Sequence, residues 1–242
     1  KAALLALPLL AGAEKAVRPH DREPLTLPME VLDSPNVELS SALIMCMTAP
    51  NGQTLHFIAG FSSPVVYALD VNFDGVEDLA VLVSPGGTNE VYRLFIHQGE
   101  HYVPVDDGQE AGLCNPAFFP DSGLVLSRGV SGLAGALHED MLFRWEDARL
   151  LPLRSAECGA YVEEYSQEGA LITKKWADML HAKVYAYQDG NLWDKTLVFE
   201  ETFNMTTQGM EEALNAFQKR EQEALWQGLG APETMPEEDE NG

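Results

Sequence analysis

The chain has 242 residues, of which 45% are hydrophobic and 22% are charged, a composition typical of a globular protein with one substantial core. Its 38 acidic residues outnumber 15 basic ones, which gives a formal net charge of −23. Because such a surface repels phosphate backbones and anionic membranes, we expect no nucleic-acid partner. Divalent cations and basic proteins are the partners that this charge favours.

At the N-terminus, Lys1 precedes a short apolar run from Ala2 to Ala11, and small residues follow. This order is typical of a secretory signal peptide, with Ala11 and Ala13 resembling a cleavage site. The run is shorter than the roughly 20 apolar residues that a transmembrane helix needs. We therefore expect residues 1–13 to be a signal peptide remnant. The protein would be secreted or periplasmic, with no stable membrane insertion after cleavage.

Residues 14–35 are polar and rich in proline, so we expect a leader or linker that becomes ordered only near Leu25 to Val31. From residue 36 to 204, short apolar runs alternate with turn signals such as Asn51-Gly52. This pattern predicts a mainly β protein of antiparallel sheets, propeller-like or sandwich. The expected strands cover residues 39–48, 54–59, 65–69, 79–83, 91–97, 101–105, 123–127, 140–145, 149–153, 185–187 and 192–200.

The region 205–230 is expected to form one C-terminal α-helix, because it is rich in Glu, Ala, Leu and Gln and its apolar residues recur at helical spacing. Thr206 or Thr207 can cap its N-terminus, and Gly228 can end it. The residues expected to dock on the β core are Met210, Ala213, Leu214 and Phe217. The acidic tail 231–242 is expected to be disordered.

One acidic stretch of nine residues carries oxygen donors at the spacing of a calcium loop. They are Asp70, Asn72, Asp74 and Asp78 at positions 1, 3, 5 and 9, with the backbone carbonyl of Val76 at position 7. Gly75 permits the sharp turn that brings these donors together, and Phe73 should point into the core. The alternative is an acidic turn without a metal, in which each Asp caps backbone amides.

The stretch does not end as an EF-hand does, because position 12 is Val81 instead of a bidentate Glu. The apolar run Leu79–Val83 follows Asp78 directly and reads as a buried strand. The sequence therefore predicts a calcium loop between two strands, with calcium as the cofactor.

At these residues the chain from Val66 to Leu79 resembles the FG-GAP or VCBS calcium loop of integrin α-subunit propellers. More narrowly, the chain from Leu55 to Leu153 is similar to a bacterial family of exported propeller-like proteins with a single such loop. The further matches are a G-x-x-N turn at Gly86 and Asn89, an aromatic strand at Tyr92–Phe95, and the pair Asn115-Pro116.

The resemblance implies a propeller-like fold pinned by calcium. Some members of that family look like lysozyme inhibitors or immunity proteins against secreted peptidoglycan hydrolases. A single calcium loop does not indicate a regular propeller of repeated blades. The chain beyond Cys158 has no counterpart in the family.

Other chemistry-bearing residues give weaker signals. His138-Glu139-Asp140 is a compact polar trio, but Leu142 stands where an H-E-x-x-H zinc site needs its second His. An exported location would permit one disulfide, Cys114–Cys158 with Cys46 free, and three buried thiols are the equal alternative. Four aromatic residues either pack in the core, which we favour, or form a surface for sugar or peptide: Trp176, Tyr185, Tyr187 and Trp193.

Together these patterns predict an exported, non-enzymatic, calcium-stabilised module that binds a protein partner, preferably a basic one. Two alternatives stay open: an inhibitor or immunity protein against a cell-wall hydrolase, and an extracellular hydrolase. No nucleophile–base pair stands out in the sequence, so no catalytic residue is expected. Carboxylates are nevertheless numerous enough for a paired glycosidase site.

Overall fold

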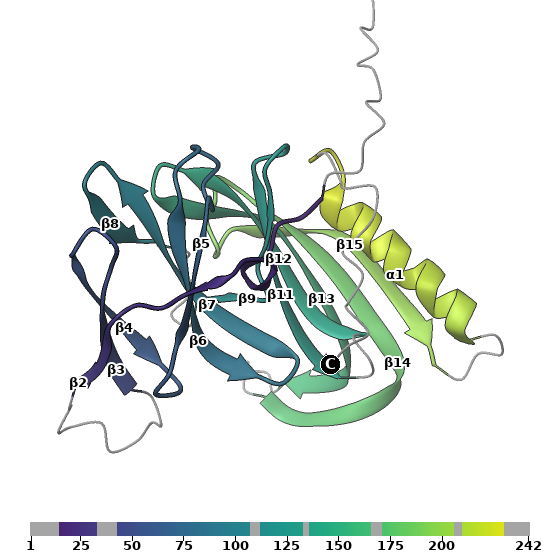
Figure 1. The fold of residues 1–242 in the computed structure, drawn as a ribbon. Coiled ribbons are helices and arrows are strands. Elements are labelled where there is room, and N and C mark those ends of the chain that lie inside the picture. Colours follow the sequence, from purple (N-terminus) through teal and green to yellow (C-terminus); the bar gives the residue numbers. More distant parts are fainter. Residues whose placement is uncertain are drawn as a thin grey trace, which may run out of the picture.

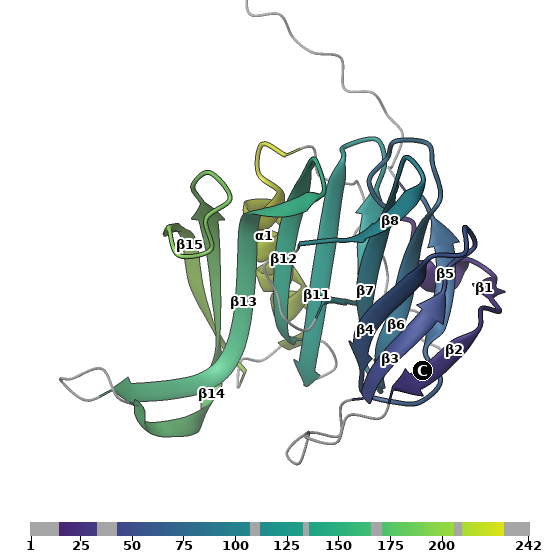
Figure 2. The same ribbon diagram turned by 90° about the vertical axis from the view of Figure 1, so that its left-hand side faces the viewer.

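Three antiparallel sheets lie one behind another, and a single helix covers the outer face of the last sheet (Figures 1 and 2). The computed structural model describes residues 15–32, 43–106, 112–132, 136–165, 171–205 and 210–229. A mainly β protein with antiparallel sheets and one C-terminal helix, as the sequence predicts, is confirmed. None of the described helices combines the length and the apolar character that crossing a bilayer requires.

Each sheet is built from consecutive strands of the chain, except that β1 belongs to the second sheet. The first sheet contains β2 (Met29–Leu32), β3 (Leu43–Thr48) and β4 (Thr54–Ala59). The second contains, in spatial order, β1 (Pro24–Leu25), β5 (Val65–Leu69), β6 (Asp78–Gly86), β7 (Asn89–Gln98) and β8 (His101–Pro104), with β9 (Leu113–Cys114) also paired to β7. The third runs in chain order through β10 (Ala117–Phe119), β11 (Leu124–Gly132), β12 (Leu137–Glu146), β13 (Arg149–Tyr165), β14 (Leu171–Tyr187) and β15 (Lys195–Asn204).

The second sheet is apolar on both faces because it lies between the other two. In β6, Leu79 and Val81 belong to the core shared with the first sheet. Ala80 and Leu82 point the other way and belong to the core shared with the third sheet. Successive side chains of a strand alternate between faces, so burial on both sides produces the unbroken apolar run seen in the sequence.

Helix α1 (Met210–Trp226) packs on the far face of the third sheet, as the sequence predicts. Phe217 is fully buried there, and Ala213 and Leu214 pack around it. Leu225 and Trp226 anchor the end of the helix against another part of the same sheet. The side chain of Met210 and the two candidate capping threonines lie outside the described residues.

The strand predictions hold for the hairpins and fall short for the long strands. The bounds of β4 and β5 agree with the predicted ranges, and the turn after Asn51 and the turn around Gly190 join antiparallel neighbours. Strands β13 and β14 are 17 residues each, far longer than the short runs predicted, and extend as a ribbon beyond their neighbours (Figure 2). Their charged residues break the apolar alternation on which the prediction relied.

The described part of the predicted leader, residues 15–32, contacts the sheets from Val17 onward, so the prediction that order begins only near Leu25 is wrong. Val17 forms an antiparallel bridge with Phe118 of β10, and a short 3-10 helix, η1 (Pro19–Asp21), follows. Strand β1 then pairs with β5. The apolar side chains of Val17 and Leu25 pack against the cores, which fixes this segment on the sheets. The expected signal peptide remnant 1–13 and the tail 231–242 lie outside the described residues.

Candidate metal centre

The loop predicted to bind calcium joins β5 to β6, so it is a strand–loop–strand element as expected. Gly75 has a φ of +85°, a backbone conformation that residues other than glycine rarely adopt. This confirms the need for glycine at the turn. Phe73 also has a positive φ, and its ring packs against the core between the second and third sheets. Phe73 and the fully buried Val71 thereby hold the loop on this core.

Within the loop, side-chain oxygens accept hydrogen bonds from backbone amides. Asp70 accepts from the amides of Asp74 at 3.1 Å and Gly75 at 2.8 Å. Asp74 accepts from the amide of Val76 at 2.8 Å and from the side-chain amide of Asn72 at 3.0 Å. This is the arrangement of an acidic capped turn, and a carboxylate with two bonds still has free acceptor capacity. Calcium binding by this loop stays a prediction.

Asp78 differs from the other loop carboxylates because it is completely buried. Its two oxygens accept from the amides of Val71 at 3.0 Å and His97 at 2.7 Å, so it joins the start of the loop to β7. Burial raises the pKa of Asp78, and the charges of Asp74 and Asp70 add to that, while the two backbone hydrogen bonds oppose it. Asp78 therefore holds the loop in place whether or not a metal is bound.

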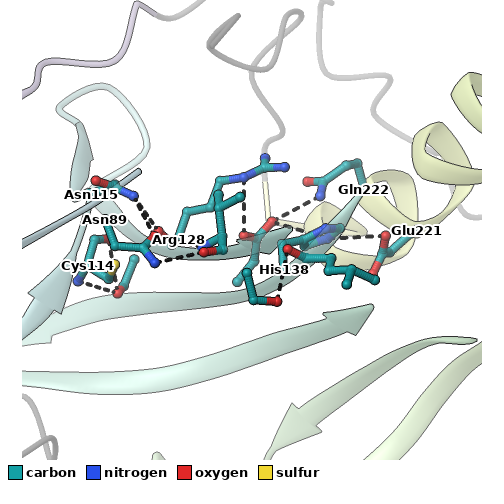
Figure 3. A network of polar contacts seen from close by, with 12 residues as sticks. Asn89, Cys114, Asn115, Arg128, His138, Glu221 and Gln222 are labelled. Carbon is teal, nitrogen blue, oxygen red and sulfur yellow. Dashed lines mark hydrogen bonds and ion pairs between the residues drawn. The ribbon is translucent and has the colours of Figure 1, made fainter. Parts of the chain in front are cut away.

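The turn and the N-P pair of the sequence resemblance lie together and join the second sheet to the third (Figure 3). The Asn89 side chain donates to the carbonyl of Val130 at 2.7 Å and accepts from the amide of Val130 at 2.8 Å. Asn115 donates to the carbonyl of Arg128 at 3.0 Å and accepts from the amide of Glu90 at 2.8 Å. Both residues are therefore structural ties between sheets.

A second polar cluster is buried between the third sheet and α1 (Figure 3). It contains His138 of β12, Cys158 of β13 and Glu221 of α1. Their ligand atoms all lie within 4.8 Å of one another. Among the described residues, this is the group of three His, Cys, Asp or Glu side chains whose ligand atoms meet that limit, and the carboxylates of the predicted calcium loop do not meet it.

Neighbouring residues surround this cluster with further polar atoms. Asp140 accepts a hydrogen bond from Gln222 Nε2 at 3.0 Å, and its other oxygen lies 3.7 Å from Arg128 Nε. Burial lowers the pKa of His138, but the 3.3 Å contact with Glu221 and the charges of Asp140 and Glu221 outweigh it, so the net pKa is raised. Burial, with Glu221 and Asp140 adding to it, raises the pKa of Cys158 to about 12.

Sequence reasoning singled out His138 and Asp140 but missed the other partners. Of the two alternatives for the cysteines, the structure has free thiols and no Cys114–Cys158 bridge. Cys114 belongs to β9 of the second sheet, and Cys158 lies on the face of the third sheet that α1 covers. A sequence signal for Glu221 does exist, since it shares a helix face with Phe217 and Leu225, where a charged residue is unexpected.

The aromatic residues are divided between surface and partly buried positions. Trp193 is 96% exposed, so the expectation that it packs in the core is wrong. It lies beside a hollow of ≈ 370 Å³ between the β12–β13 and β14–β15 turns. Tyr185 and Tyr187 are half-buried on β14. The side chain of Trp176 lies outside the described residues.

Comparisons with protein-family models, curated proteins and solved structures find no match to this chain.

Proposed function

We propose that the chain is an exported, non-enzymatic binding module whose second sheet is stabilised by calcium. The observation that carries the proposal is the position of Asp78. This buried carboxylate fastens the loop to β7, while Asp70 and Asp74 sit on the same loop nearer to solvent. The carbonyl of Val76 and the side chain of Asn72 complete the oxygen donors of the proposed site.

Charge crowding in this loop favours a cation. Four carboxylates lie within nine residues, those of Asp70, Asp74, Glu77 and Asp78, and the amides that bind the three Asp side chains carry only partial charges. Calcium takes six to eight oxygen ligands from carboxylates, carboxamides and carbonyls, the three kinds of donor present here. An ion bound here would act on stability, because the loop is continuous with β5 and β6 in the middle of the stack.

Calcium titration of chelator-treated protein tests this proposal, by calorimetry and by the melting temperature. A ligand that binds only the folded state raises the free energy of unfolding by about 2.7 kcal/mol when its concentration is a hundred times Kd. We expect Asp74→Ala to abolish the heat of binding and the calcium-dependent rise in melting temperature. Glu77→Ala is the matched control, because Glu77 is an exposed acid in the same loop but outside the proposed ligands. Neither heat nor a shift with the unmodified chain at millimolar calcium would reject the site.

The surface that we propose for the partner is the hollow beside Trp193. Its wall carries three acids and one base, Asp106, Glu146, Asp189 and Arg149, and Arg149 is paired with Asp106 at 3.4 Å. Exposure of a large aromatic side chain to water is unfavourable in free energy, and such side chains often anchor protein interfaces. A Lys or Arg of a basic partner would fit here, over the Trp193 ring and beside the carboxylates.

A basic lysozyme is a suitable probe, because it also tests the inhibitor version of this proposal. We expect its association rate to fall with increasing salt and to survive deletion of residues 232–242. Trp193→Ala should weaken binding by about tenfold or more, as for an interface hot spot. Leu197→Ala, another exposed apolar residue of the β14–β15 hairpin, should not. Absence of binding at low ionic strength would reject the inhibitor version, and binding indifferent to salt would reject the electrostatic account.

The hydrolase alternative finds less support in the described carboxylates. Asp140 and Glu221 are the acids that gather around a histidine, and neither has any exposed surface. A glycosidase needs two carboxyl groups that reach its substrate in an open cleft. A cluster under a helix favours a role in holding the fold, which is consistent with a binding module.

A further inference from the structure

The buried cluster between α1 and the third sheet brings together three different metal-binding side chains. His138 and Cys158 are directly opposite each other on the antiparallel pair β12–β13, so their side chains emerge side by side on one face. Glu221 reaches down to them from α1. The distance from His138 Nε2 to Glu221 Oε2 is 3.3 Å (Figure 3).

Glu221 is poorly satisfied by the protein alone. It has no exposed surface, and neither of its carboxylate oxygens accepts a hydrogen bond of good geometry. The nearest basic atom is His138 Nε2, whose contact is long for a charge-assisted bond. Burying an unpaired carboxylate destabilises the folded state, so such groups are normally paired, protonated or bound to a metal. The orphaned oxygens thus point to a missing positive partner.

We propose that His138, Cys158 and Glu221 form a binding site for a zinc-class transition-metal ion, separate from the calcium loop. Zinc binds imidazole nitrogen, thiolate sulfur and carboxylate oxygen at about 2.0–2.3 Å in tetrahedral geometry. Ligand atoms around such an ion lie roughly 3.3–3.8 Å apart, as those bond lengths require. The 3.3 Å separation of His138 Nε2 and Glu221 Oε2 fits this spacing. All three ligand atoms lie within 4.8 Å of one another, so only a small inward movement would bring them to bonding distance of one ion.

The donor types select the class of metal. Calcium and magnesium prefer hard oxygen ligands and do not take thiolate or imidazole as main donors. A mixed nitrogen, sulfur and oxygen set suits zinc and its transition-metal neighbours. Asp140 is the next oxygen donor, with Oδ2 at 4.0 Å from His138 Nε2 and a hydrogen bond from Gln222. It is placed either to complete the coordination or to orient it from outside.

The charges also balance when the ion is present. Thiolate and carboxylate from Cys158 and Glu221 carry two negative charges, which one divalent ion neutralises beside a neutral His138. Asp140 has its own positive neighbour, Arg128, at 3.7 Å. The competing arrangement is a protonated His138 paired with Glu221 beside a neutral thiol. That pair uses two of the three side chains and leaves Cys158 as a packing side chain of the apolar core.

A metal here would be structural. The site is closed by α1, so it offers no open position to a substrate, which is the usual distinction between structural and catalytic zinc. The ion would fasten the helix to β12 and β13 at a point where the interface otherwise buries charge. Because the ligands come from both the sheet and the helix, the ion should enter as the protein folds or as α1 lifts.

The test uses the full chain without an affinity tag, unfolded in chelator and refolded with zinc, with cobalt or with no metal. We expect one zinc per chain after desalting and a higher melting temperature than that of the metal-free protein. The cobalt form should show a thiolate-to-cobalt charge-transfer band and the visible bands of a tetrahedral site. Cys158→Ser should remove the charge-transfer band, and Cys114→Ser should keep it. Glu221→Gln should lower zinc affinity by at least tenfold.

Two results would overturn the proposal. One is wild-type protein that refolds without bound zinc or any change in melting temperature. The other is a cobalt spectrum that lacks the thiolate band or is unchanged in Cys158→Ser; the cluster would then be the His138–Glu221 ion pair. If Cys158→Ser does not fold, the wild-type cobalt spectrum and Glu221→Gln decide the outcome. Zinc binding should also persist in Asp74→Ala, which separates this site from the proposed calcium loop.

Discussion

The indole Nε1 of Trp145 donates a hydrogen bond of 2.7 Å to the backbone carbonyl of Val71. Trp145 lies on β12, and Val71 is the residue between Asp70 and Asn72 of the proposed calcium loop. This contact therefore ties the loop of the second sheet to a strand of the third. It gives the loop a fixed support that the loop sequence does not contain.

Trp145→Phe should lower the free energy of unfolding by about 1–3 kcal/mol, because it leaves the Val71 carbonyl without its donor and removes part of the ring. If the calcium proposal holds, the same change should also weaken calcium binding. Urea unfolding and calorimetry measure the two effects. Trp193→Phe is the matched control, since the same change at a 96% exposed position should stay within about 0.5 kcal/mol. Equal losses at the two positions would contradict the role given to Trp145.

Asn89→Ala should destabilise the protein by about 2–3 kcal/mol. The substitution leaves both the amide and the carbonyl of Val130 without partners in a partly buried place. Asn89→Asp keeps an acceptor and loses the donor, so its effect should be intermediate. Asn191→Ala serves as the control, because its side chain caps only the exposed amide of Trp193. Denaturant midpoints that rank the variants in another order would argue against the Asn89 tie.

Gly112→Ala should be more destabilising than Gly99→Ala. Both glycines have positive φ, but a Cβ at Gly112 would collide with the carbonyl oxygen of Tyr92, while Gly99 has nothing within 4 Å. The conformational cost alone is about 1 kcal/mol, so the Gly99 variant should lose about that much. The Gly112 variant should lose about 2–4 kcal/mol, since backbone must move. Thermal unfolding of the pair separates the clash from the backbone preference.

Cys114 should react slowly with alkylating reagents at pH 8. Burial raises its pKa to about 11, so the folded protein favours the neutral thiol and only about 0.1% is thiolate at that pH. The rate should rise about tenfold for each pH unit towards 11, as long as the fold persists. Mass spectrometry of alkylated peptides isolates this residue, and urea-unfolded protein gives the unshifted rate. A native rate equal to the unfolded rate would show that Cys114 is not protected.

The link between α1 and β15 should weaken in acid. Arg220 donates to Glu201 at 2.8 Å, and this hydrogen bond lowers the pKa of Glu201 from its ordinary 4.5 despite partial burial. A lowered pKa stabilises the fold above about 4.5, and that stability is lost as the pH falls through the folded value. Glu201→Gln should lower the melting temperature slightly at pH 7 and flatten its fall in acid. Arg220→Gln should give the same pattern if the pair is the cause.

The sequence by itself determined the class of the fold and its local turns. The alternating residues of Thr54–Ala59 and the continuous apolar run Val65–Leu69 specify strands, and glycines such as Gly75 mark turns that need a positive φ. The unbroken run Leu79–Val83 indicated a strand buried on both faces, and the spacing of Phe217 and Leu225 indicated a helix that docks. These features depend on neighbours along the chain, so the periodicity of the sequence records them.

Only the tertiary structure decided what lies together across the sheets. Cys158 meets Glu221 because α1 returns over β13, and it cannot meet Cys114 because a different sheet holds that residue. Trp193 lies in the turn between β14 and β15 and is exposed, although the size and apolar character of an indole by themselves favour burial. Contacts of this kind depend on how sheets stack and where a helix crosses them. Local propensity and spacing carry no record of either, which is why the buried His138 cluster was not predicted from the sequence.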